Sequence, residues 1–369
     1  MDFTDWEFKK LGDIGEIING LTYSPNDIDE AGILVLRSSN IQNRNLSFED
    51  NVYVKTDSYN PIQENDILIC VRNGSKNLIG KNALINKENE GVAFGAFMSV
   101  YRSPFNKFLF HWFDTNEYKE IVHKNLGATI NSINGSDLKK FKVPFPSVEE
   151  QKKLASFLSL IEERMQTQSK IIKELTILKK GMAKKIFSQK LRFKDDKGND
   201  YPEWRNKKLG DISTITTGSS NREDSILDGE FTFFDRSQDV RTSNRYLFDK
   251  EAVIVPGEGQ EFIPKYFIGK FDLHQRTYAI FDFSEVNGKY LYYHLHDDDR
   301  HLQSQAVGST VKSLRLPMFQ SLPIKFPSLP EQQKIANFLS SIDNKIEIET
   351  KVLQKLEEQK KYLLQNMFV

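Results

Sequence analysis

Residues 145–158 read FPSVEEQKKLASFL, and residues 326–339 read FPSLPEQQKIANFL, 181 positions later. A second repeat lies upstream of each copy, where Trp6 and KKLGDI at 9–14 match Trp204 and KKLGDI at 207–212, a shift of 198. Tandem copies of one unit predict two similar domains that carry two similar sites. The repeat therefore governs both the domain organisation and the search for function.

A long helix is predicted after each copy of the Phe-Pro-Ser motif. Ser147 and Ser328 suit the N-cap position, and Glu150 and Glu331 follow three residues later, which is the pattern of a capping box. Apolar residues then recur with heptad spacing, which is typical of a coiled coil. The predicted seam residues are Leu154, Leu158, Ile161, Met165, Ile172 and Leu175 in the first helix and Ile335, Leu339, Ile342, Ile346, Leu353 and Leu356 in the second.

Polar residues interrupt both seams at equivalent positions. Gln168 corresponds to Glu349 and Lys179 to Lys360, each at the shift of 181. Polar seam residues fix the register of paired helices at some cost in stability. Any amphipathic helix that packs on a domain has a similar pattern, but the matching interruptions favour mutual pairing. Some 38 helical residues span on the order of 55–60 Å, so we expect the pair to set a distance between two domains.

The repeat and the predicted elements divide the chain into five segments. Short runs that contain β-branched and aromatic residues, such as residues 33–36 and 277–281, predict strands in the globular segments. A length of 369 residues suits two or three domains. The predicted segments are a first globular domain at 1–146, a long helix at 147–190, a linker at 191–200, a second globular domain at 201–327 and a second long helix at 328–369.

Composition limits the class of protein. The single cysteine, Cys70, excludes an internal disulfide framework and fits a reducing compartment, so we expect a cytoplasmic protein. No apolar run approaches the roughly 20 residues of a membrane helix, so no membrane partner is expected. The net charge is zero, so any basic surface must be local. The sequence contains no recognisable catalytic constellation, and no set of metal ligands recurs in both halves. We therefore predict neither catalytic residues nor a metal site.

These repeated motifs resemble a known family. Trp-x-x-Lys-Lys-Leu-Gly-Asp-Ile opens each half, and Phe-Pro-Ser-x-x-Glu-Gln-x-Lys-x-Ala-x-Phe-Leu leads into each helix. In this order, over nearly the whole chain, they resemble the specificity subunits of type I restriction–modification systems. The resemblance implies an α+β fold with two tandem α/β target recognition domains related by pseudo-twofold symmetry and separated by two long helices that form an antiparallel coiled coil. It also implies a non-catalytic subunit that reads a bipartite DNA sequence, with the unread spacer set by the helices.

The same resemblance implies partners. They are double-stranded DNA with a bipartite site and two methyltransferase subunits, to which the full assembly adds endonuclease subunits that translocate DNA. The Asn-Pro-Pro-aromatic tetrapeptide of amino-methyltransferases does not occur in this sequence. We therefore expect no cofactor in this chain and S-adenosylmethionine on the methyltransferase partner. The alternative function is a protein–protein scaffold with paired binding domains on a coiled coil.

Candidate DNA contacts are sought where the two halves differ, between about residues 21–126 and 219–307. Base contacts carry specificity, and Arg, Asn and Gln suit guanine and adenine edges while Lys suits phosphates. Arg37-Ser38 recurs as Arg236-Ser237, which favours a scaffold or DNA-backbone role for both arginines. The predicted DNA-binding residues are Arg37, Asn40, Arg72, Asn73, Lys76 and Lys81 in the first half and Arg236, Gln238, Arg241, Gln260, Lys265, Lys270 and Arg276 in the second.

A basic cluster at the end of the first helix leaves two interpretations open. Cations are favoured near a helix C-terminus because of the helix dipole. Alternatively, the cluster forms a stripe that faces the phosphates of the spacer DNA. Its members are Lys179, Lys180, Lys184, Lys185, Lys190 and Arg192.

Overall fold

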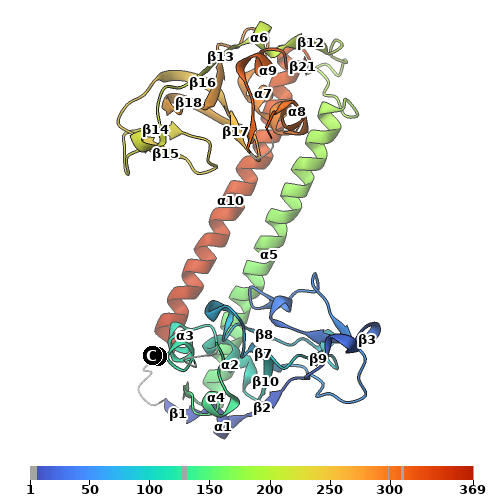
Figure 1. Ribbon diagram of the computed structural model, residues 1–369, viewed down its shortest axis with the longest axis vertical. Coiled ribbons are helices and arrows are strands. Elements are labelled where there is room, and N and C mark those ends of the chain that lie inside the picture. The colour runs from blue at the N-terminus through green and yellow to red at the C-terminus, as the bar shows by residue number, and fades with distance from the viewer. Residues whose placement is uncertain (1–5, 127–130, 298, 309–310, 369) are drawn as a thin grey trace. The chain divides into compact units, whose positions relative to one another are not determined.

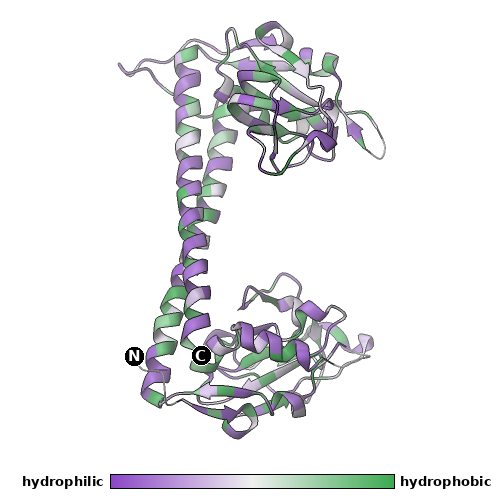
Figure 2. Cartoon of the chain, turned by 90° about the vertical axis from the view of Figure 1, so that its left-hand side faces the viewer, coloured by the Kyte–Doolittle hydropathy of each residue, from purple (hydrophilic) through white to green (hydrophobic). Residues whose placement is uncertain are grey.

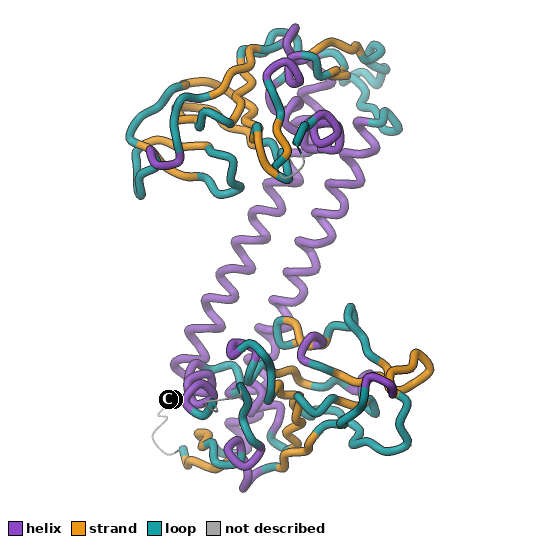
Figure 3. Tube along the Cα trace, in the orientation of Figure 1, coloured by secondary structure: helices purple, strands orange, loops and turns teal. Residues whose placement is uncertain are grey.

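The computed structural model describes residues 6–126, 131–297, 299–308 and 311–368 and divides into two compact units (Figure 1). Unit 1 contains Met1–Gln168 and Val352–Val369, and unit 2 contains Ser169–Lys351. Two long helices, α5 (Val148–Phe187) and α10 (Leu329–Met367), each contribute to both units. Neither helix is interrupted by a loop (Figure 3). Each unit therefore combines one globular part with lengths of both helices.

The globular part of unit 1 begins and ends on one two-stranded sheet. β1 (Glu7–Lys10) pairs antiparallel with β11 (Lys142–Phe145), which leads directly into α5. The KKLGDI run forms the end of β1 and the short helix α1 (Leu11–Ile14), whose Leu11 and Ile14 are buried. The repeated motif thus joins the segment that enters the domain to the segment that leaves it.

Three further sheets complete the strands of unit 1. The largest has the order β2-β10-β7-β8, with all neighbours antiparallel. A second has the order β6-β3-β9, and β4 and β5 form a hairpin. The strands are β2 (Glu16–Asn19), β3 (Ile28–Leu36), β4 (Ile41–Gln42), β5 (Asn45–Leu46), β6 (Tyr53–Val54), β7 (Ile67–Cys70), β8 (Asn82–Leu84), β9 (Ala93–Phe94) and β10 (Met98–Arg102).

The helices of unit 1 connect its sheets to the long helices. α2 (Asn106–Trp112), α3 (Asn116–Lys124) and α4 (Gly135–Leu138) follow β10. The main core of the unit includes α2 and α3 residues together with Leu158 of α5 and Leu364 of α10. Because burial of apolar surface is the dominant favourable term in folding, this shared core holds the globular part on both helix segments.

Unit 2 repeats this framework. β12 (Arg205–Lys208) pairs with β21 (Pro323–Phe326) in the register of the β1–β11 pair, and α6 (Leu209–Ile212) repeats α1. The main sheet is larger, with the order β13-β19-β16-β18-β14-β15, and a small sheet pairs β17 with β20. The strands are β13 (Thr214–Thr217), β14 (Phe231–Phe234), β15 (Arg241–Ser243), β16 (Phe248–Pro256), β17 (Glu258–Gly259), β18 (Lys265–Leu273), β19 (Thr277–Phe281) and β20 (Lys312–Ser313).

The helices of unit 2 again border a core shared with the long helices. α7 (Gly288–Asp297), α8 (Asp299–Gln305) and α9 (Leu316–Gln320) precede β21. Ile186 of α5 and Leu339 of α10 are buried in the same core as residues of α7 and α9. Short 3-10 turns lie at Pro25–Asp27, Ser38–Asn40, Lys76–Leu78 and Lys87–Asn89 in unit 1 and at Arg222–Asp224 in unit 2.

The long helices run antiparallel within each unit. In unit 1 the start of α5 shares its core with the end of α10, and in unit 2 the end of α5 shares its core with the start of α10. Hydrophobic and hydrophilic residues alternate along both helices (Figure 2). All twelve predicted seam residues are buried or half-buried in the structure. The predicted coiled-coil seam therefore coincides with the buried face of each helix.

The two capping boxes have different outcomes. At the start of α5 the Glu150 amide donates to Ser147 Oγ at 3.3 Å, and the Ser147 amide donates to Glu150 Oε2 at 3.1 Å. At the start of α10 the prediction is wrong, because the fully buried Glu331 pairs with Arg192 at 2.9 Å. A buried carboxylate requires a partner charge, and Arg192 supplies it from the segment after α5.

Candidate nucleic-acid interface

The ends of β3 and β14 show how the two halves correspond. Two backbone hydrogen bonds of 2.9 Å define the match, from Gly95 N to Leu36 O in unit 1 and from His274 N to Phe234 O in unit 2. Arg37 therefore corresponds to Asp235, and Arg236 corresponds to Ser38. The sequence alignment of Arg37 with Arg236 is wrong by one residue. The recurrence that favoured a scaffold role for Arg236 disappears with it.

The same registers align the loops that follow β7 and β16. Met98 pairs with Cys70 in unit 1, and the equivalent pair in unit 2 is Thr277 with Pro256. Arg72 lies two residues after the end of β7 and corresponds to Glu258, two residues after the end of β16. Phe97 lies just before β10 and corresponds to Arg276, just before β19. We call these positions, with the adjoining residues Ser38 and Arg236, the strand-end edge of each unit.

The strand-end edge of unit 1 combines a cation with an aromatic ring. The guanidinium of Arg72 lies 5.6 Å from the centroid of the Phe97 ring, and both side chains are exposed. Asn73 is half-buried and donates through Nδ2 to Ser38 Oγ at 3.0 Å, which joins the loop after β7 to the end of β3. Lys76 is exposed. The predictions for Arg72 and Lys76 agree with this exposure, and their contact with DNA stays a prediction.

Two residues of the β3–β4 segment stabilise that segment. Arg37 forms an ion pair of 2.8 Å with Asp50. Asn40 is fully buried, and its Nδ2 donates to Ser47 O at 3.0 Å and to Asp50 O at 3.2 Å while its Oδ1 accepts from the Arg37 amide. These bonds, with a further one of 3.3 Å from Nδ2 to Asn51 Oδ1, direct Asn40 to its own loop, and its contact with DNA stays a prediction.

The strand-end edge of unit 2 is a cluster of three charges. Glu258 Oε2 accepts from Arg236 Nη1 at 2.8 Å, and Glu258 Oε1 pairs with Arg276 Nη1. The side chains of Arg236 and Arg276 are 46% and 57% exposed, whereas that of Glu258 is 15% exposed. Two guanidiniums thus face solvent on either side of one carboxylate.

The other predicted contacts of unit 2 divide into two groups. Lys265 and Arg241 stabilise the loop after β14: the Lys265 ammonium donates to Ser237 O at 2.5 Å, and Arg241 Nε pairs with Asp235 at 3.1 Å. Burial lowers the pKa of Lys265. Gln238, Gln260 and Lys270 are exposed, with Gln238 Nε2 donating to Glu261 at 3.2 Å and the Lys270 ammonium 4.8 Å from the Tyr246 ring.

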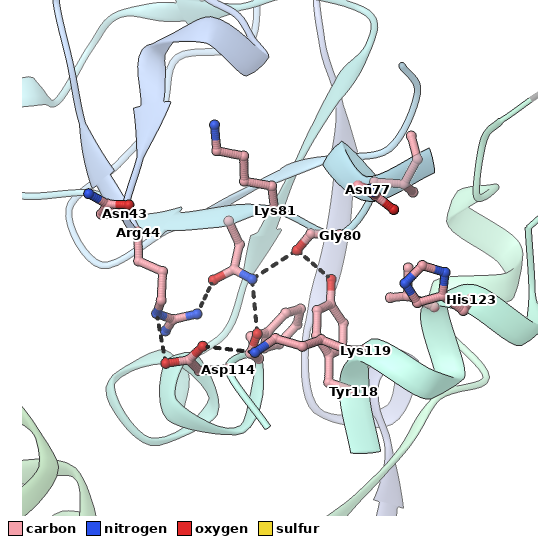
Figure 4. Close-up of a pocket in the computed structure, with 13 residues that line it drawn as sticks. Asn43, Arg44, Asn77, Gly80, Lys81, Asp114, Tyr118, Lys119 and His123 are labelled. Atoms are coloured by element: carbon pink, nitrogen blue, oxygen red, sulfur yellow. Dashed lines mark hydrogen bonds and ion pairs between the residues drawn. The ribbon is translucent and has the colours of Figure 1, made fainter. Parts of the chain in front are cut away.

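A cavity of about 480 Å³ opens beside the loop that carries Lys81 (Figure 4). Lys81 is half-buried, and its ammonium lies 3.5 Å from Ser38 O. On the opposite wall, Arg44 and Lys119 both pair with Asp114 at 3.5 Å. Arg44 and Asp114 on this wall are largely buried, whereas Lys119 is exposed, so the cavity borders an ion pair that stabilises the fold.

Arg44 is the centre of that support. It follows Asn43 in the β4–β5 turn, and both have positive φ, 63° and 49° respectively. The turn conformation matches the twist of a two-residue hairpin but is unusual for a long side chain. Arg44 donates to Asn82 Oδ1 at 2.7 Å, bonds to Phe110 O and stacks 3.7 Å from the Phe110 ring. These contacts hold the hairpin in this conformation against α2.

A buried polar layer joins this support to both long helices of unit 1. Lys360 of α10 is 8% exposed, and its ammonium lies 2.7 Å from both Asp114 and Glu162. Glu162 of α5 also lies 3.7 Å from His111 Nδ1. We call Arg44, Asp114, His111, Glu162 and Lys360 the first polar layer. It connects the β4–β5 hairpin, helix α2, the turn between α2 and α3, and both long helices.

The carboxyl groups of the first polar layer have lowered pKa values. Burial opposes ionisation of Glu162, but the hydrogen bond and charge of His111 and the charges of Lys360 and Arg44 outweigh it and lower the pKa from 4.5 to about 2. Burial likewise opposes ionisation of Asp114, and the charges of Arg44 and Lys360 lower its pKa. Both groups are therefore carboxylates at neutral pH.

Unit 2 has an equivalent layer with fewer charges. Lys179 of α5 pairs with Asp343 of α10 at 2.5 Å and lies 5.3 Å from the Tyr293 ring. The Tyr293 hydroxyl donates to Asp343 Oδ2 at 2.7 Å. We call Lys179, Asp343 and Tyr293 the second polar layer. The predicted polar interruptions Lys179 and Lys360 are thus ion-paired seam residues.

Two members of the basic cluster have defined partners. Lys179 belongs to the second polar layer, and Arg192 binds Glu331 and donates to Pro202 O at 2.7 Å. Both charges are paired inside unit 2. Lys180, Lys184, Lys185 and Lys190 are exposed, and both interpretations remain available for these four.

Sequence reasoning missed several of these residues. Glu162 and Asp343 could have been found, because they differ by the helix shift of 181 and lie one helix turn from seam positions. Arg44 and Glu258 carry no such signal, because only the folded chain brings them to their partners. Phe97 was overlooked because aromatic residues in loops are usually packed, and its exposure of 55% is evident only in the structure.

No group of three or more His, Cys, Asp or Glu side chains suitable for a metal ion occurs in the described part of the chain. None of the helices at these positions combines the length and apolar character needed to cross a membrane.

Comparison with known proteins decides the family. The sequence model of the family described as "Type I restriction modification DNA specificity domain" matches residues 4–176 and again residues 201–358. The chain belongs to this family. The two matches of this specificity protein coincide with its internal repeat, and the resemblance inferred from the repeated motifs is confirmed. The predicted α+β fold, with tandem domains and two long helices, is confirmed as well.

The relatives of this specificity protein match nearly all of the chain or a part of it. The putative type I restriction enzyme MjaX specificity subunit of Methanocaldococcus jannaschii is 28% identical over 398 residues, covering 98% of this chain and 92% of the relative. The EcoDI specificity subunit of Escherichia coli is 30% identical over 145 residues, or 39% of this chain and 32% of that protein. The crystal structure of a type I S subunit from M. genitalium shares the fold, with a TM-score of 0.68 at 18% identity, covering 99% of this chain and 96% of the other.

Proposed function

We propose that this specificity protein reads a bipartite double-stranded DNA target, with one half-site contacted by the globular part of each unit. The observation that carries the proposal is a shared framework with different strand-end edges. β1–β11 and β12–β21 have the same register, whereas Arg72 and Phe97 are replaced by Glu258 and Arg276. Equal scaffolds with different exposed side chains suit two different base sequences.

The chemistry is assigned to partners. We propose that two methyltransferase subunits bind the chain, hold S-adenosylmethionine and methylate adenines at the sequence that it selects, and that endonuclease subunits complete the restricting assembly. A net charge of zero limits the counterion-release affinity that basic DNA-binding proteins gain. Partner subunits that enclose the duplex would supply the missing positive charge, so the isolated chain should bind DNA weakly.

Mapping of methylated adenines tests this function. The chain is reconstituted with a cognate methyltransferase subunit and S-adenosylmethionine, incubated with DNA of diverse sequence, and the modified positions are read by sequencing. We expect methylation at one split sequence. Methylation without sequence preference, or equal methylation by the methyltransferase alone, would contradict the proposal.

The helices are proposed to set the unread spacer. Helices α5 and α10 are continuous over 40 and 39 residues, and each polar layer fixes their register within its unit. One heptad inserted after Lys170 and another after Lys351 would lengthen both helices by about 10 Å. We expect a spacer about 3 base pairs longer, because one base pair occupies about 3.4 Å of axis. A heptad inserted in α5 alone is the control, because it leaves the seam unmatched. Altered half-sites in the double insertion would contradict the spacer role.

A further inference from the structure

The strand-end edge of unit 2 holds Arg236 and Arg276 in an arrangement that suits contacts with DNA bases. Arg236 leaves the loop after β14, Arg276 leaves the tight β18–β19 turn, and Glu258 lies in β17 after the end of β16. Three separate backbone segments therefore bring one carboxylate between two guanidiniums. These three segments meet only in the folded protein, and no sequence motif marks them.

Each of the three backbone segments is held in place. The Gly257 amide donates to Arg276 O at 2.9 Å, which ties the Glu258 segment to the β18–β19 turn. The Ser237 amide donates to Asp235 Oδ1 at 2.8 Å, and the Lys265 ammonium donates to Ser237 O at 2.5 Å, which stabilises the loop that carries Arg236. Side chains on fixed supports lose less conformational entropy when they bind.

Each of the two arginines contacts Glu258 through one nitrogen of its guanidinium, and its other N–H groups could bind a base. Both guanidiniums meet Glu258 through Nη1. A guanidinium carries five N–H donors, so the Nε–Nη2 side of each is a second pair of donors. Two parallel donors match the O6 and N7 acceptors of guanine in the major groove, the commonest specific contact of arginine with DNA. Both side chains are partly exposed, as a contact with a ligand requires.

We propose that Glu258 is a positioning residue that orients Arg236 and Arg276 to read guanines in the half-site bound by unit 2. The inference rests on the proposed DNA-reading function and adds the residues and base class for one half-site. Unit 1 has Arg72, Phe97 and Ser38 at the equivalent positions, so the same framework presents different chemistry there. The half-site bound by unit 1 should therefore be unaffected by changes at Glu258.

The test compares both half-sites in one assay. The full chain, with the methyltransferase partner, is given a randomised DNA library, and base preference is measured at every position of the methylated site. We expect Arg236→Gln and Arg276→Gln each to relax one G·C position in the same half-site by about 10- to 100-fold. Glu258→Gln should relax both of those positions together. The other half-site serves as the internal reference.

Glu285→Gln is the matched control. Glu285 also lies between two cations of unit 2, pairing with Arg205 at 2.9 Å and with Lys207, but it lies beside the framework strand β12. Its loss should leave all base preferences unchanged. Arg236→Lys and Arg276→Lys retain the charge and the exposed position, so they keep the test informative if Glu258→Gln reduces folding.

The outcomes separate the two levels of the proposal. If wild-type methylation shows no sequence preference, the DNA-reading function fails and the inference fails with it. If wild-type methylation is specific but Glu258→Gln and both arginine variants keep wild-type preference, the inference alone is overturned. A change that appears in both half-sites, or equally in Glu285→Gln, would likewise overturn it, because a general loss of structure would then explain the effect.

Discussion

The two polar layers have equivalent helix residues but different surroundings. Glu162 and Lys179 of α5 correspond to Asp343 and Lys360 of α10 at a shift of 181. In unit 1 the lysine comes from α10 and the acid from α5, and in unit 2 these origins are reversed. The sequence therefore repeats one lysine and one acidic residue in each long helix, and in each unit a lysine of one helix pairs with an acid of the other.

The globular parts make the layers unequal. Unit 1 adds a second carboxylate, Asp114, and a second cation, Arg44, whereas unit 2 adds the neutral hydroxyl of Tyr293. The Lys360 side chain is 10% exposed and that of Lys179 is 18% exposed. The helix repeat thus supplies a common pair, and each globular part determines how deeply and with how many charges that pair is buried.

Among these substitutions, removal of Lys360 from the first polar layer should cause the largest loss of stability. Lys360→Met leaves Asp114 and Glu162 without their shared cation, and loss of one partner from a buried ion pair costs about 3–5 kcal/mol. Urea denaturation should show this loss of unfolding free energy, and hydrogen exchange should locate it in unit 1. Lys361→Met, at an exposed neighbouring position, should change stability by no more than about 0.5 kcal/mol. Equal effects of the two variants would contradict the burial argument.

Acid should weaken the first polar layer in a defined pH window. The pKa of Glu162 is about 2 in the folded protein, compared with 4.5 ordinarily, so the folded state binds fewer protons than the unfolded state. Its contribution is complete above pH 4.5 and is lost as the pH falls toward 2. The loss amounts to about 3 kcal/mol at most, because each pKa unit corresponds to about 1.4 kcal/mol.

Thermal unfolding between pH 5 and pH 2 measures this acid effect, which should be smaller in Glu162→Gln. An identical pH profile for the variant and the wild type would show that Glu162 does not carry the effect.

Arg44→Lys should separate the effect of the Arg44 charge from the effect of its hydrogen bonds and ring stacking. The substitution keeps the charge beside Asp114 but removes the fork that binds Asn82 and Phe110 O, together with the stacking on the Phe110 ring. We expect a loss of about 1–2 kcal/mol of unfolding free energy, measured by urea denaturation. Arg164→Lys, at an exposed position of α5, is the control. A neutral result at Arg44 would show that charge alone stabilises the turn.

Lys179→Met should have the smallest effect. The ion pair with Asp343 is more exposed than the first layer, and the Tyr293 hydroxyl continues to donate to Asp343. Partly exposed ion pairs contribute about 1 kcal/mol or less. Urea denaturation should therefore separate Lys179→Met from Lys360→Met by at least about 2 kcal/mol. Similar losses would mean that the helix pair, rather than its surroundings, determines the strength of each layer.

Periodic features could be predicted from the sequence because they depend on local geometry. The heptad pattern placed Leu158, Ile161, Ile335 and Leu339 on the buried face, and all four are buried. The strand predicted at 277–281 forms β19 with the same bounds. The helix positions follow from the 3.6-residue turn of a helix, and the strand follows from the preference of β-branched and aromatic residues for strands.

Features that depend on distant partners could not be predicted in the same way. Ser328 and Glu331 repeat the capping motif of Ser147 and Glu150, but Arg192 takes Glu331 away from the helix end. Asn40 resembled a base-contacting residue by type, yet its burial assigns it to the backbone of its own loop. Residue type describes what a side chain can bind, and burial determines which partner it meets.

The sequence by itself determined that this protein has two framework copies, two long helices and paired polar interruptions in their seams. Repeats and periodicity can be recognised in the sequence because they depend on residues close to one another in the chain. Only the tertiary structure decided that Lys360 meets Asp114, that Arg236 corresponds to Ser38, and that Glu258 lies between two arginines. Those relations join segments far apart in the chain, and they arise only when folding buries their supports and brings their charges within contact distance.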